Sequence, residues 1–430
     1  MTWNGTANRN LRSEAAGSIQ MKILMLADVF FPDTVGGAGR VAYELGRQLC
    51  RKGHQVHVLT RNPEGTLSRR QQIEDDLFVY RFNLPAREGL GYFFSELRNS
   101  STAAKKANQE IGFNLLCSHQ SLVASGPLFS RPISRIPFVH FFHSPWHEEY
   151  LIKKRNTGGI ASRTVKAIAF FMKCMEKRVL SKALKIFVLS RYSVEQIAAI
   201  HHLPLEKVVM IPAGIELERF PLPKAGKRPV KEALRIPMDK TVFFTVRNLV
   251  PRMGIENVIE AFKQSNALRE KGLFLIGGEG FLKKSLQAMV KDHDLEESVK
   301  FLGRISEDDL PRYYQAADFF VLPTRELEGF GLVILESMAC GTPVLATPVG
   351  AIPETVGVFD KNLLFEGTSR ENIRRKLEDV INRPEQYRFD PRVCGKFVEE
   401  RYSWEKMADA FEKEVIGLLR TAIQQKRRFP

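Results

Sequence analysis

The chain has 430 residues, 44% of them apolar, and a formal net charge of +15. This length suggests two to three domains and is ample for sizeable hydrophobic cores. No stretch approaches the 18 uninterrupted apolar residues of a membrane-spanning helix, and residues 1–20 lack the apolar centre of a secretory signal. We therefore expect a globular protein that begins with a disordered extension over residues 1–20.

The positive charge indicates an anionic partner, such as the phosphates of a small molecule, an acidic membrane surface or nucleic acid. Zinc-finger spacing, RNP-type aromatic boxes and long basic runs are all missing from the sequence, so we expect no nucleic-acid partner. The five cysteines are scattered, form no CxxC pair and are odd in number. They fit unpaired thiols in a reducing cytoplasm.

The first half of the chain alternates apolar strands with helices. Residues 21–28 predict a strand, a glycine-opened helix extends to about residue 52, and a strand returns over residues 55–60. This is a βαβ unit at the start of an open, mostly parallel sheet. Further strands are expected at 78–82, 113–118, 137–142, 183–189 and 208–212, with helices at 93–108 and 160–182.

Gly37, Gly39 and Ala42 also match the dinucleotide fingerprint G-x-G-x-x-A, and Arg61 at the end of the second strand would suit a 2′-phosphate. An NADP-dependent oxidoreductase is therefore an alternative interpretation. The fingerprint requires a tight turn from strand to helix, whereas residues 28–35 precede the first glycine here. The match is weak for that reason.

A polar and aromatic cluster, His143-Ser144-Pro145-Trp146-His147-Glu148-Glu149, follows the strand at 137–142. Open α/β sheets bind their ligands at the carboxyl ends of strands. His143 is therefore a candidate site residue, although a loop histidine bonded to backbone would give the same pattern.

Residues 221–231 are rich in Pro, Lys and Gly and predict a linker. The alternation then repeats, with strands expected at 241–246, 273–277, 299–302, 318–322 and 344–347, and a last helix near 404–421. We expect a first domain over residues 21–212, a second over 213–400 and a terminal helical segment over 401–430.

The stretch that organises the second domain is residues 326–344. An apolar strand stopped by Pro323 precedes it, Gly329 and Gly331 free the turn, and a helix should extend to Cys340. The helix N-terminus then lies at the carboxyl end of a strand, where the backbone N–H groups of residues 330–333 favour a phosphate. Glu336, about one turn into the helix, points back towards that anion. Its useful partner is a neutral donor such as a ribose hydroxyl.

Glu328 and Glu336, with the flanking Gly-Phe-Gly-Leu and Ala-Cys-Gly-Thr-Pro-Val, form a Glu-x7-Glu pattern. It resembles the signature of retaining glycosyltransferases of family 4, which have the GT-B fold. The resemblance implies two Rossmann-like doubly wound α/β domains facing a cleft, with the C-terminal helix crossing back to the first domain. It also implies that Glu328 contacts the donor sugar and that Glu336 contacts the ribose.

The resemblance extends to other positions. Gly37 and Gly39 match loops that line the cleft near the diphosphate and the acceptor, and His143 matches a cleft histidine. The family pattern near the diphosphate is an arginine, here Arg247, followed six positions later by a lysine, where this chain has Met253. We assign the lysine's role to the neighbouring Arg252, whose guanidinium supplies a fixed positive charge.

Glycine-rich turns complete the expected donor site. Residues 277–280 resemble a family turn, and residues 301–304, including Arg304, resemble the segment along the nucleotide base. The amides of Phe330, Gly331 and Leu332 are expected to hold the phosphates.

These residues imply a metal-independent retaining enzyme without a cofactor, which moves a sugar from a nucleotide-diphospho-sugar to a glycan, a lipid-linked or a small-molecule acceptor, as in polysaccharide biosynthesis. The substitution at Met253 keeps a second alternative open, a GT-B-like binding protein without catalysis. The helix at 160–182 has a basic face formed by Arg163, Lys166, Lys173 and Lys177, opposite an apolar face formed by Ile168, Met172, Met175 and Val179. A solvated face is the simplest reading, but the basic face would also suit peripheral attachment to an anionic membrane at its cytoplasmic side.

Overall fold

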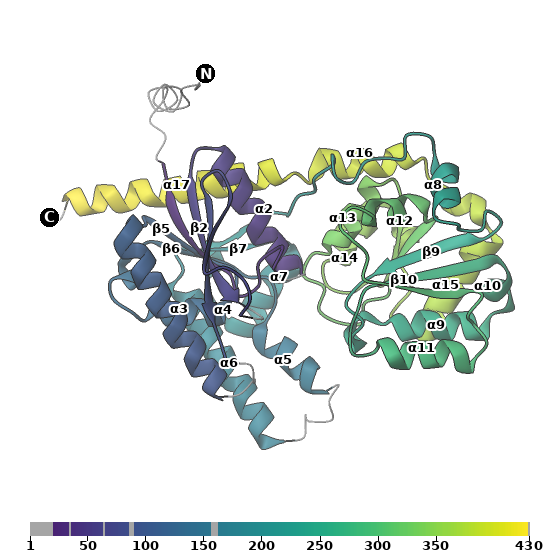
Figure 1. The fold of residues 1–430 in the computed structure, drawn as a ribbon, viewed down its shortest axis with the longest axis horizontal. Coiled ribbons are helices and arrows are strands. Elements are labelled where there is room, and N and C mark those ends of the chain that lie inside the picture. Colours follow the sequence, from purple (N-terminus) through teal and green to yellow (C-terminus); the bar gives the residue numbers. More distant parts are fainter. Residues whose placement is uncertain (1–19, 34–35, 63–64, 86–89, 156–161, 429–430) are drawn as a thin grey trace. The chain divides into compact units, whose positions relative to one another are not determined.

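The structure is a computed structural model that describes residues 20–33, 36–62, 65–85, 90–155 and 162–428, with side chains up to residue 420 (Figure 1). The extension expected over residues 1–20 lies almost wholly outside the described residues. In the described part of the chain, no helix is both long and apolar enough to cross a membrane.

The chain folds around two mostly parallel sheets, the first of which has eight strands. Their order is β3-β4-β2-β1-β5-β6-β7-β8, and β3 is antiparallel to its neighbour β4. The strands are β1 (Lys22–Leu26), β2 (Gln55–Asn62), β3 (Arg70–Glu74), β4 (Leu77–Asn83), β5 (Leu115–Ser118), β6 (Phe138–Phe141), β7 (Lys185–Val188) and β8 (Val208–Met210).

Burial explains which strands were visible in the sequence. β1 is a short apolar run that pairs with β2 on one side and β5 on the other, with Ile23 opposite both Val56 and Leu115. Such central parallel strands are covered on both faces and are almost wholly apolar. β3 was not predicted, because its sequence Arg-Gln-Gln-Ile-Glu is polar and lies largely exposed at the sheet edge.

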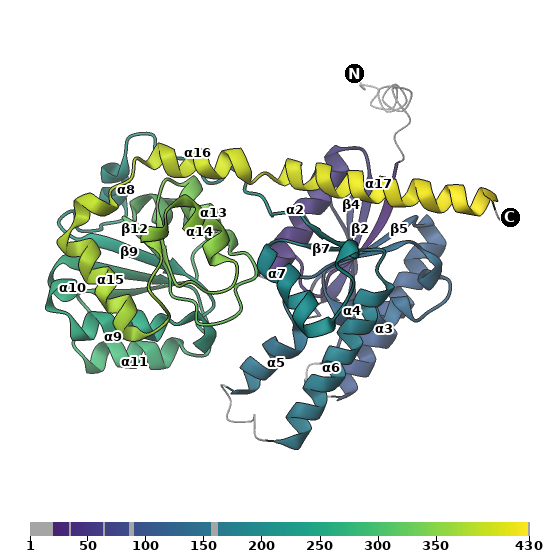
Figure 2. The same cartoon turned by 180° about the vertical axis from the view of Figure 1, so that it is seen from behind.

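Helices accompany the first sheet. They are α2 (Gly37–Arg51), α3 (Leu90–Ile111), α4 (Ser121–Leu128), α5 (Trp146–Arg155), α6 (Arg163–Lys182) and α7 (Arg191–Gln196), with short helical turns at Ile133–Arg135, Ile197–His201 and Leu205–Lys207. α3 and α4 pack side by side (Figure 2). A Cβ at Gly126 would lie 2.1 Å from the carbonyl oxygen of Leu97. Only glycine permits this close helix contact.

The second sheet has five parallel strands in the order β11-β10-β9-β12-β13. They are β9 (Thr241–Val246), β10 (Gly272–Gly277), β11 (Val299–Gly303), β12 (Phe319–Leu322) and β13 (Val344–Ala346). The order reverses direction at β9, since β10 and β12 flank it. Doubly wound sheets bind ligands at the carboxyl ends of the strands beside such a switch point.

The helices around the second sheet form two groups by their mutual packing, one with α9, α10, α11 and α15 and the other with α8, α12, α13 and α16. The helices here are α8 (Lys227–Ala233), α9 (Ile255–Gln264), α10 (Asn266–Lys271), α11 (Lys283–Asp292), α12 (Leu310–Ala316), α13 (Leu332–Ala339), α14 (Ile352–Phe359), α15 (Arg370–Asn382) and α16 (Pro391–Arg401), with turns at Pro251–Met253, Lys361–Leu363 and Pro384–Tyr387. The last helix of the chain, α17 (Trp404–Arg428), follows α16.

The linker expected over residues 221–231 is partly wrong, because α8 begins at Lys227. Lys231 is buried on this helix and its ammonium lies 2.8 Å from the carboxylate of Asp318, just before β12. A buried charge is tolerated when it is paired in this way. The composition of the segment therefore concealed a packed helix.

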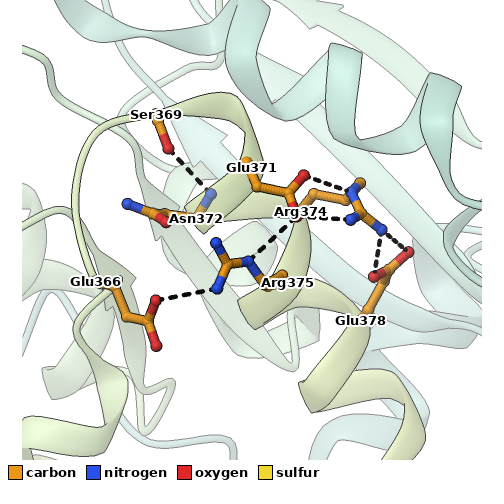
Figure 3. Close-up of polar contacts among 7 residues, drawn as sticks. All are labelled: Glu366, Ser369, Glu371, Asn372, Arg374, Arg375 and Glu378. Carbon is orange, nitrogen blue, oxygen red and sulfur yellow. Dashed lines mark hydrogen bonds and ion pairs between the residues drawn. The ribbon is translucent and has the colours of Figure 1, made fainter.

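α15 shows how the local sequence caps a helix and places ion pairs along it. The hydroxyl of Ser369 accepts a hydrogen bond from the backbone N–H of Asn372 at 3.2 Å and caps the first turn. Arg374 donates to Glu371 and Glu378, and Arg375 pairs with Glu371 and Glu366 (Figure 3). These exposed pairs contribute little to stability.

Two compact units are formed from interleaved segments of the chain. Unit 1 comprises Met1–Phe141, Met175–Ile186 and Ala408–Pro430, and unit 2 comprises Phe142–Cys174 and Phe187–Met407. Most of α17 therefore belongs to unit 1. Its Phe411 stacks on Phe141 of β6, with ring centroids 5.8 Å apart, and its Glu412 lies 2.9 Å from Lys52.

We predict that Phe411→Ala lowers the free energy of unfolding of unit 1 by about 3–5 kcal/mol, because it deletes a fully buried aromatic ring. Urea unfolding followed by circular dichroism measures the change. Lys413→Ala, at an exposed position of the same helix, is the matched control. Equal effects of the two substitutions would contradict the packing of α17 described here.

Candidate active site

The loop from β12 to α13 is the centre of the candidate site. α13 begins at Leu332, and its N-cap is Gly331 in the left-handed region, at φ 83°. The amide of Ile334 is already bonded to the carbonyl of Gly331 at 2.9 Å. The N–H groups of Leu332 and Val333 have no acceptor inside the helix, as in any first turn. The structure therefore has a helix N-terminus at the position where the sequence predicts anion binding.

A buried ion pair connects this loop to β9. The guanidinium of Arg247, just after β9, donates to Oε2 of Glu328 at 2.7 Å and to Oγ1 of Thr324 at 3.3 Å. The Arg247 and Glu328 side chains are only 9% and 12% exposed. Two residues that the sequence assigned to the same site thus lie in direct contact.

Arg252 acts on the backbone of the same loop. Its Nη1 donates to the carbonyl oxygen of Leu327 at 2.8 Å, and its own carbonyl accepts from the amide of Arg325. Leu327 has φ 56°, a left-handed conformation that costs a non-glycine residue free energy. Arg252 therefore holds the residue before Glu328 in place. Met253, at the position of the family lysine, is buried and turned away from this role.

Glu336 is half-buried on α13 and accepts a hydrogen bond from the hydroxyl of Tyr314 at 2.8 Å. Tyr314 is fully buried on α12. Burial, together with the nearby Glu336 carboxylate, raises the pKa of Tyr314 well above its ordinary value. The phenol therefore remains a donor and fixes the orientation of the Glu336 carboxylate.

Glycine-rich turns at the ends of β10 and β11 pack backbone against backbone. Gly278 has φ 111°, and a Cβ there would lie 1.9 Å from the carbonyl oxygen of Arg247. Its amide donates to the carbonyl of Gly303 at 2.7 Å. Arg304, which follows, is exposed. These turns hold the backbone of Arg247.

The structure also places His143 within unit 2, half-buried after β6. A Cβ on Gly329 would lie 2.6 Å from the carbonyl oxygen of His143, so the neighbour of Glu328 must be glycine. Ser190 donates to the carbonyl of Gly329 at 2.7 Å. The backbone of His143 thus adjoins the β12–α13 loop.

The remaining predicted glycines, Gly37 and Gly39, belong to unit 1 at the start of α2. A Cβ on Gly39 would lie 3.1 Å from the carbonyl oxygen of Val29, so the glycine serves a close approach of α2 to the loop after β1. Residues 27–36 separate β1 from α2. This long connection does not match the tight turn of a dinucleotide fingerprint.

The sequence reasoning missed two partners in this site. Thr324 is fully buried between Arg247 and Glu328, and Tyr314 orients Glu336. Thr324 directly follows Pro323 at the carboxyl end of β12, a position that could have marked it. Nothing near Tyr314 in the sequence pointed to Glu336.

Two family models match the chain. Residues 35–219 match Glycosyltransferase Family 4, and residues 227–390 match glycosyl transferases group 1. The chain belongs to glycosyltransferase family 4. The family membership favours a transferase over the oxidoreductase alternative.

One relative of this family 4 chain is the GDP-mannose-dependent monoacylated alpha-(1-6)-phosphatidylinositol monomannoside mannosyltransferase of Corynebacterium glutamicum. It is 32% identical over 206 residues, which cover 46% of this chain and 53% of the relative. The match thus spans about half the length of that relative.

Among solved structures, sucrose-phosphate synthase from Thermosynechococcus elongatus has a TM-score of 0.79 at 22% identity and covers 93% of this chain and 100% of its own. HepE from Anabaena in complex with UDP-glucose has a TM-score of 0.69 at 18% identity, with 93% and 100% covered. These likenesses show that this family 4 chain has the GT-B fold with two parallel-sheet α/β domains.

Replacing Arg252 and Met253 separates a site role from a packing role in this glycosyltransferase. We predict that Arg252→Ala lowers turnover by roughly ten- to a hundredfold, since a charge-assisted hydrogen bond contributes about 1.5–3 kcal/mol. Met253→Ala should instead lower stability by about 2–5 kcal/mol, because it truncates a buried side chain. Steady-state kinetics and thermal unfolding of both variants measure this. A larger loss of turnover in Met253→Ala than in Arg252→Ala would remove Arg252 from the site.

Proposed function

We propose that this chain is a retaining, metal-independent glycosyltransferase that uses a nucleotide-diphospho-sugar donor. The observation that carries the proposal is the buried Arg247–Glu328 ion pair beside the N-terminus of α13. A guanidinium and unbonded helix N–H groups bind phosphate. A carboxylate at the same point accepts hydrogen bonds from sugar hydroxyls. The groups that would bind phosphate and the carboxylate that would bind sugar hydroxyls therefore lie next to each other.

The proposed chemistry depends on charge that grows during the reaction. When the bond from sugar to phosphate breaks, negative charge increases on the diphosphate. Fixed cations and amides stabilise this charge more in the transition state than in the ground state. Arg247 and the α13 amides would do so directly, and Arg252 would add its charge while it holds the loop. No metal ion is needed for this charge balance.

Glu328 has a second task in this scheme. It neutralises Arg247, because a buried guanidinium without a partner would be costly. A bound diphosphate would take over part of that role and leave Glu328 oxygens for the sugar hydroxyls. The bound diphosphate and Glu328 would then share the neutralisation of Arg247.

We infer an acceptor that carries a hydroxyl group on a glycan, a lipid or a small molecule, with His143 on the acceptor side and a phosphate oxygen of the leaving group removing the proton. The Corynebacterium glutamicum relative is named for a GDP-mannose donor and a phosphatidylinositol monomannoside acceptor, and the HepE structure holds UDP-glucose. Two nucleotides therefore occur among similar proteins, and the donor screen must include both.

The experiment that tests the function is a screen of the purified chain against UDP- and GDP-sugars, with donor hydrolysis and thermal shift as readouts. We expect one nucleotide sugar to stabilise the protein and to be hydrolysed slowly. Glu328→Gln is the control, since its loss of hydrolysis excludes a contaminating enzyme. Stabilisation without hydrolysis or transfer would favour the non-catalytic binding protein, and stabilisation by NADP would favour the oxidoreductase.

Glu336→Gln tests the ribose assignment. We predict weaker binding of the nucleotide sugar by roughly 1.5–3 kcal/mol, because the variant loses an ionised acceptor. Isothermal titration calorimetry measures the affinity. Tyr314→Phe keeps the carboxylate but removes its orienting donor, so it should weaken binding less. Wild-type affinity of Glu336→Gln would contradict the assignment.

We further propose that α6 attaches the enzyme to an anionic membrane at its cytoplasmic face, which would bring it to a lipid-linked acceptor. Arg163, Lys166 and Lys177 are exposed on α6, and Lys173 is half-buried. Phe170 is 69% exposed and Phe171 is 50% exposed on the same helix. The expected apolar face is only partly buried, since Ile168 is 37% exposed. Exposed rings among basic side chains suit the boundary between lipid headgroups and acyl chains.

Vesicle binding tests this attachment. We predict cosedimentation with anionic but not neutral vesicles, lost at high salt, since each basic residue contributes on the order of 1 kcal/mol near an anionic surface. Changing Arg163, Lys166, Lys173 and Lys177 to Gln should abolish it and lowers the net charge from +15 by four, to +11.

A matched control neutralises four exposed basic residues that each have an acidic partner, Arg228, Lys300, Arg312 and Lys396. It has the same net charge and should retain binding. Equal loss in both variants would show that total charge, and not α6, is responsible. Binding to neutral vesicles would also overturn the proposal.

A further inference from the structure

A second cluster of charged groups lies in unit 1, at the carboxyl edge of the first sheet. Asp28 follows β1 and Arg61 lies near the end of β2, and their side chains form an ion pair 2.5 Å long. The guanidinium of Arg61 also donates to the backbone carbonyl of Asp28 at 2.9 Å and to the hydroxyl of Tyr92 on α3. None of these residues belongs to the candidate active site.

The amide of Gln120, directly after β5, fixes the same loop. Its Oε1 accepts from the backbone N–H of Asp28 at 2.7 Å. The Asp28 and Arg61 side chains are 20% and 27% exposed. The pair is therefore held from three strand ends and still reaches the surface.

Glu96 lies beneath this ion pair on α3 and is 0% exposed. No hydrogen bond of ordinary geometry from the described residues reaches either of its carboxylate oxygens. Its carboxyl group interacts with the carboxyl group of Asp28 and with the guanidinium of Arg61, so two acids share one guanidinium. A fully buried carboxylate next to a second, partly buried one is costly to ionise, and one of the two retains a proton. That proton supplies a hydrogen bond between the two carboxyl groups.

We propose that Glu96 is a positioning residue that stays protonated in the folded protein and shares its proton with Asp28, which holds the Asp28–Arg61 pair at the edge of the sheet. With one proton on the pair, the charges of Asp28 and Arg61 balance. Without it, the cluster carries an uncompensated buried negative charge. The proposal concerns the shared proton of Glu96 and Asp28 in unit 1. Only its predicted effect on turnover rests on the proposed function.

The groups around Glu96 agree with this assignment. Burial, and next the Asp28 carboxylate, raise the pKa of Glu96 from 4.5 to about 9, whereas Arg61 and the hydroxyl of Tyr92, on the same helix, lower it. Titratable or charged side chains on the elements packed against α3 are His57 and Arg61 of β2, Tyr80 and Arg81 of β4, and the exposed Arg135 of the turn Ile133–Arg135. Arg81 is already paired with Asp33 at 2.5 Å. α4 carries no titratable side chain in its sequence.

The sign of the pH dependence follows from proton binding. Between pH 4.5 and about 9 the folded chain retains a proton on Glu96 that the unfolded chain has released. The stabilising contribution of the neutral acid is therefore complete below pH 4.5 and is lost as the pH rises through the folded pKa. In this window the folding equilibrium constant falls about tenfold per pH unit through this group.

Glu96→Gln supplies a permanent donor to Asp28 and cannot titrate. We expect its folding constant, relative to wild type, to increase about tenfold per pH unit between pH 6 and pH 8, measured by urea unfolding. Glu110→Gln, at an exposed position of the same helix, should show no such trend. Parallel pH profiles of wild type and Glu96→Gln would overturn the proposal.

Infrared difference spectroscopy tests the proton directly, and its deciding observation, the band at pH 7, needs only the wild-type protein. The wild-type protein at pH 7 should show the carbonyl band of a protonated carboxylic acid, which shifts in heavy water and is absent in Glu96→Gln. Asp28→Asn should lower the pH at which this band disappears, because it removes the neighbouring negative charge. A missing band in the wild type would overturn the proposal.

The pH dependence of turnover then shows whether the Asp28–Arg61 pair affects the reaction. We expect wild-type turnover to decline as the pH rises through about 9 and Glu96→Gln to show no decline there. If both enzymes decline alike while the infrared and unfolding results hold, the positioning role in catalysis is excluded. Absence of any turnover would contradict the proposed function and leaves the infrared and unfolding tests in force.

Discussion

The ion pair between Arg247 and Glu328 joins the end of β9 to the loop that leads into α13, and several contacts of the candidate site support one of its two partners. Arg252 fixes Leu327 in a strained conformation before Glu328, and Thr324 fills the space between the charges. Gly278 brings a second turn against the backbone of Arg247. Because both charges are almost buried, neither can be removed without stranding the other.

This arrangement separates the tasks of the residues around it. Glu336 lies on α13, where a hydrogen bond from the hydroxyl of Tyr314 orients its carboxylate. The helix N-terminus needs only Gly331, whose left-handed conformation turns the chain into α13. The site thus combines the Arg247–Glu328 ion pair, the Glu336 carboxylate with its Tyr314 donor, and the backbone N–H groups at the start of α13.

Much of this was predictable from the sequence, because central parallel strands are apolar runs and the β12–α13 segment carries its glycines and glutamates in one local stretch. Arg247 and Glu328 were both named, yet their direct contact was not, since they are distant in the chain. β3 is polar and exposed, so hydrophobic patterning missed it. α8 was hidden in a Lys- and Pro-rich segment, where only the pairing of Lys231 with Asp318 shows burial. Glu96 gave no signal, because its setting is created by α3 packing over two strand ends.

Whether Arg252 can act in place of the lysine depends on where its side chain points. The sequence offered an arginine beside Met253 but could not say where either side chain points. The structure buries Met253 and directs Arg252 to the Leu327 carbonyl. Its influence on the donor would therefore pass largely through the loop that carries Glu328.

The membership of α17 in unit 1 has a consequence for synthesis of the chain. Unit 1 is assembled from residues 1–141, 175–186 and 408–430, so its last segment is synthesised only after residues 187–407 of unit 2. Until then, Phe141 and Lys52 lack their partners Phe411 and Glu412. Domains generally fold as units during synthesis from the N-terminus. Here unit 1 cannot be completed during synthesis until the whole of unit 2 has been made.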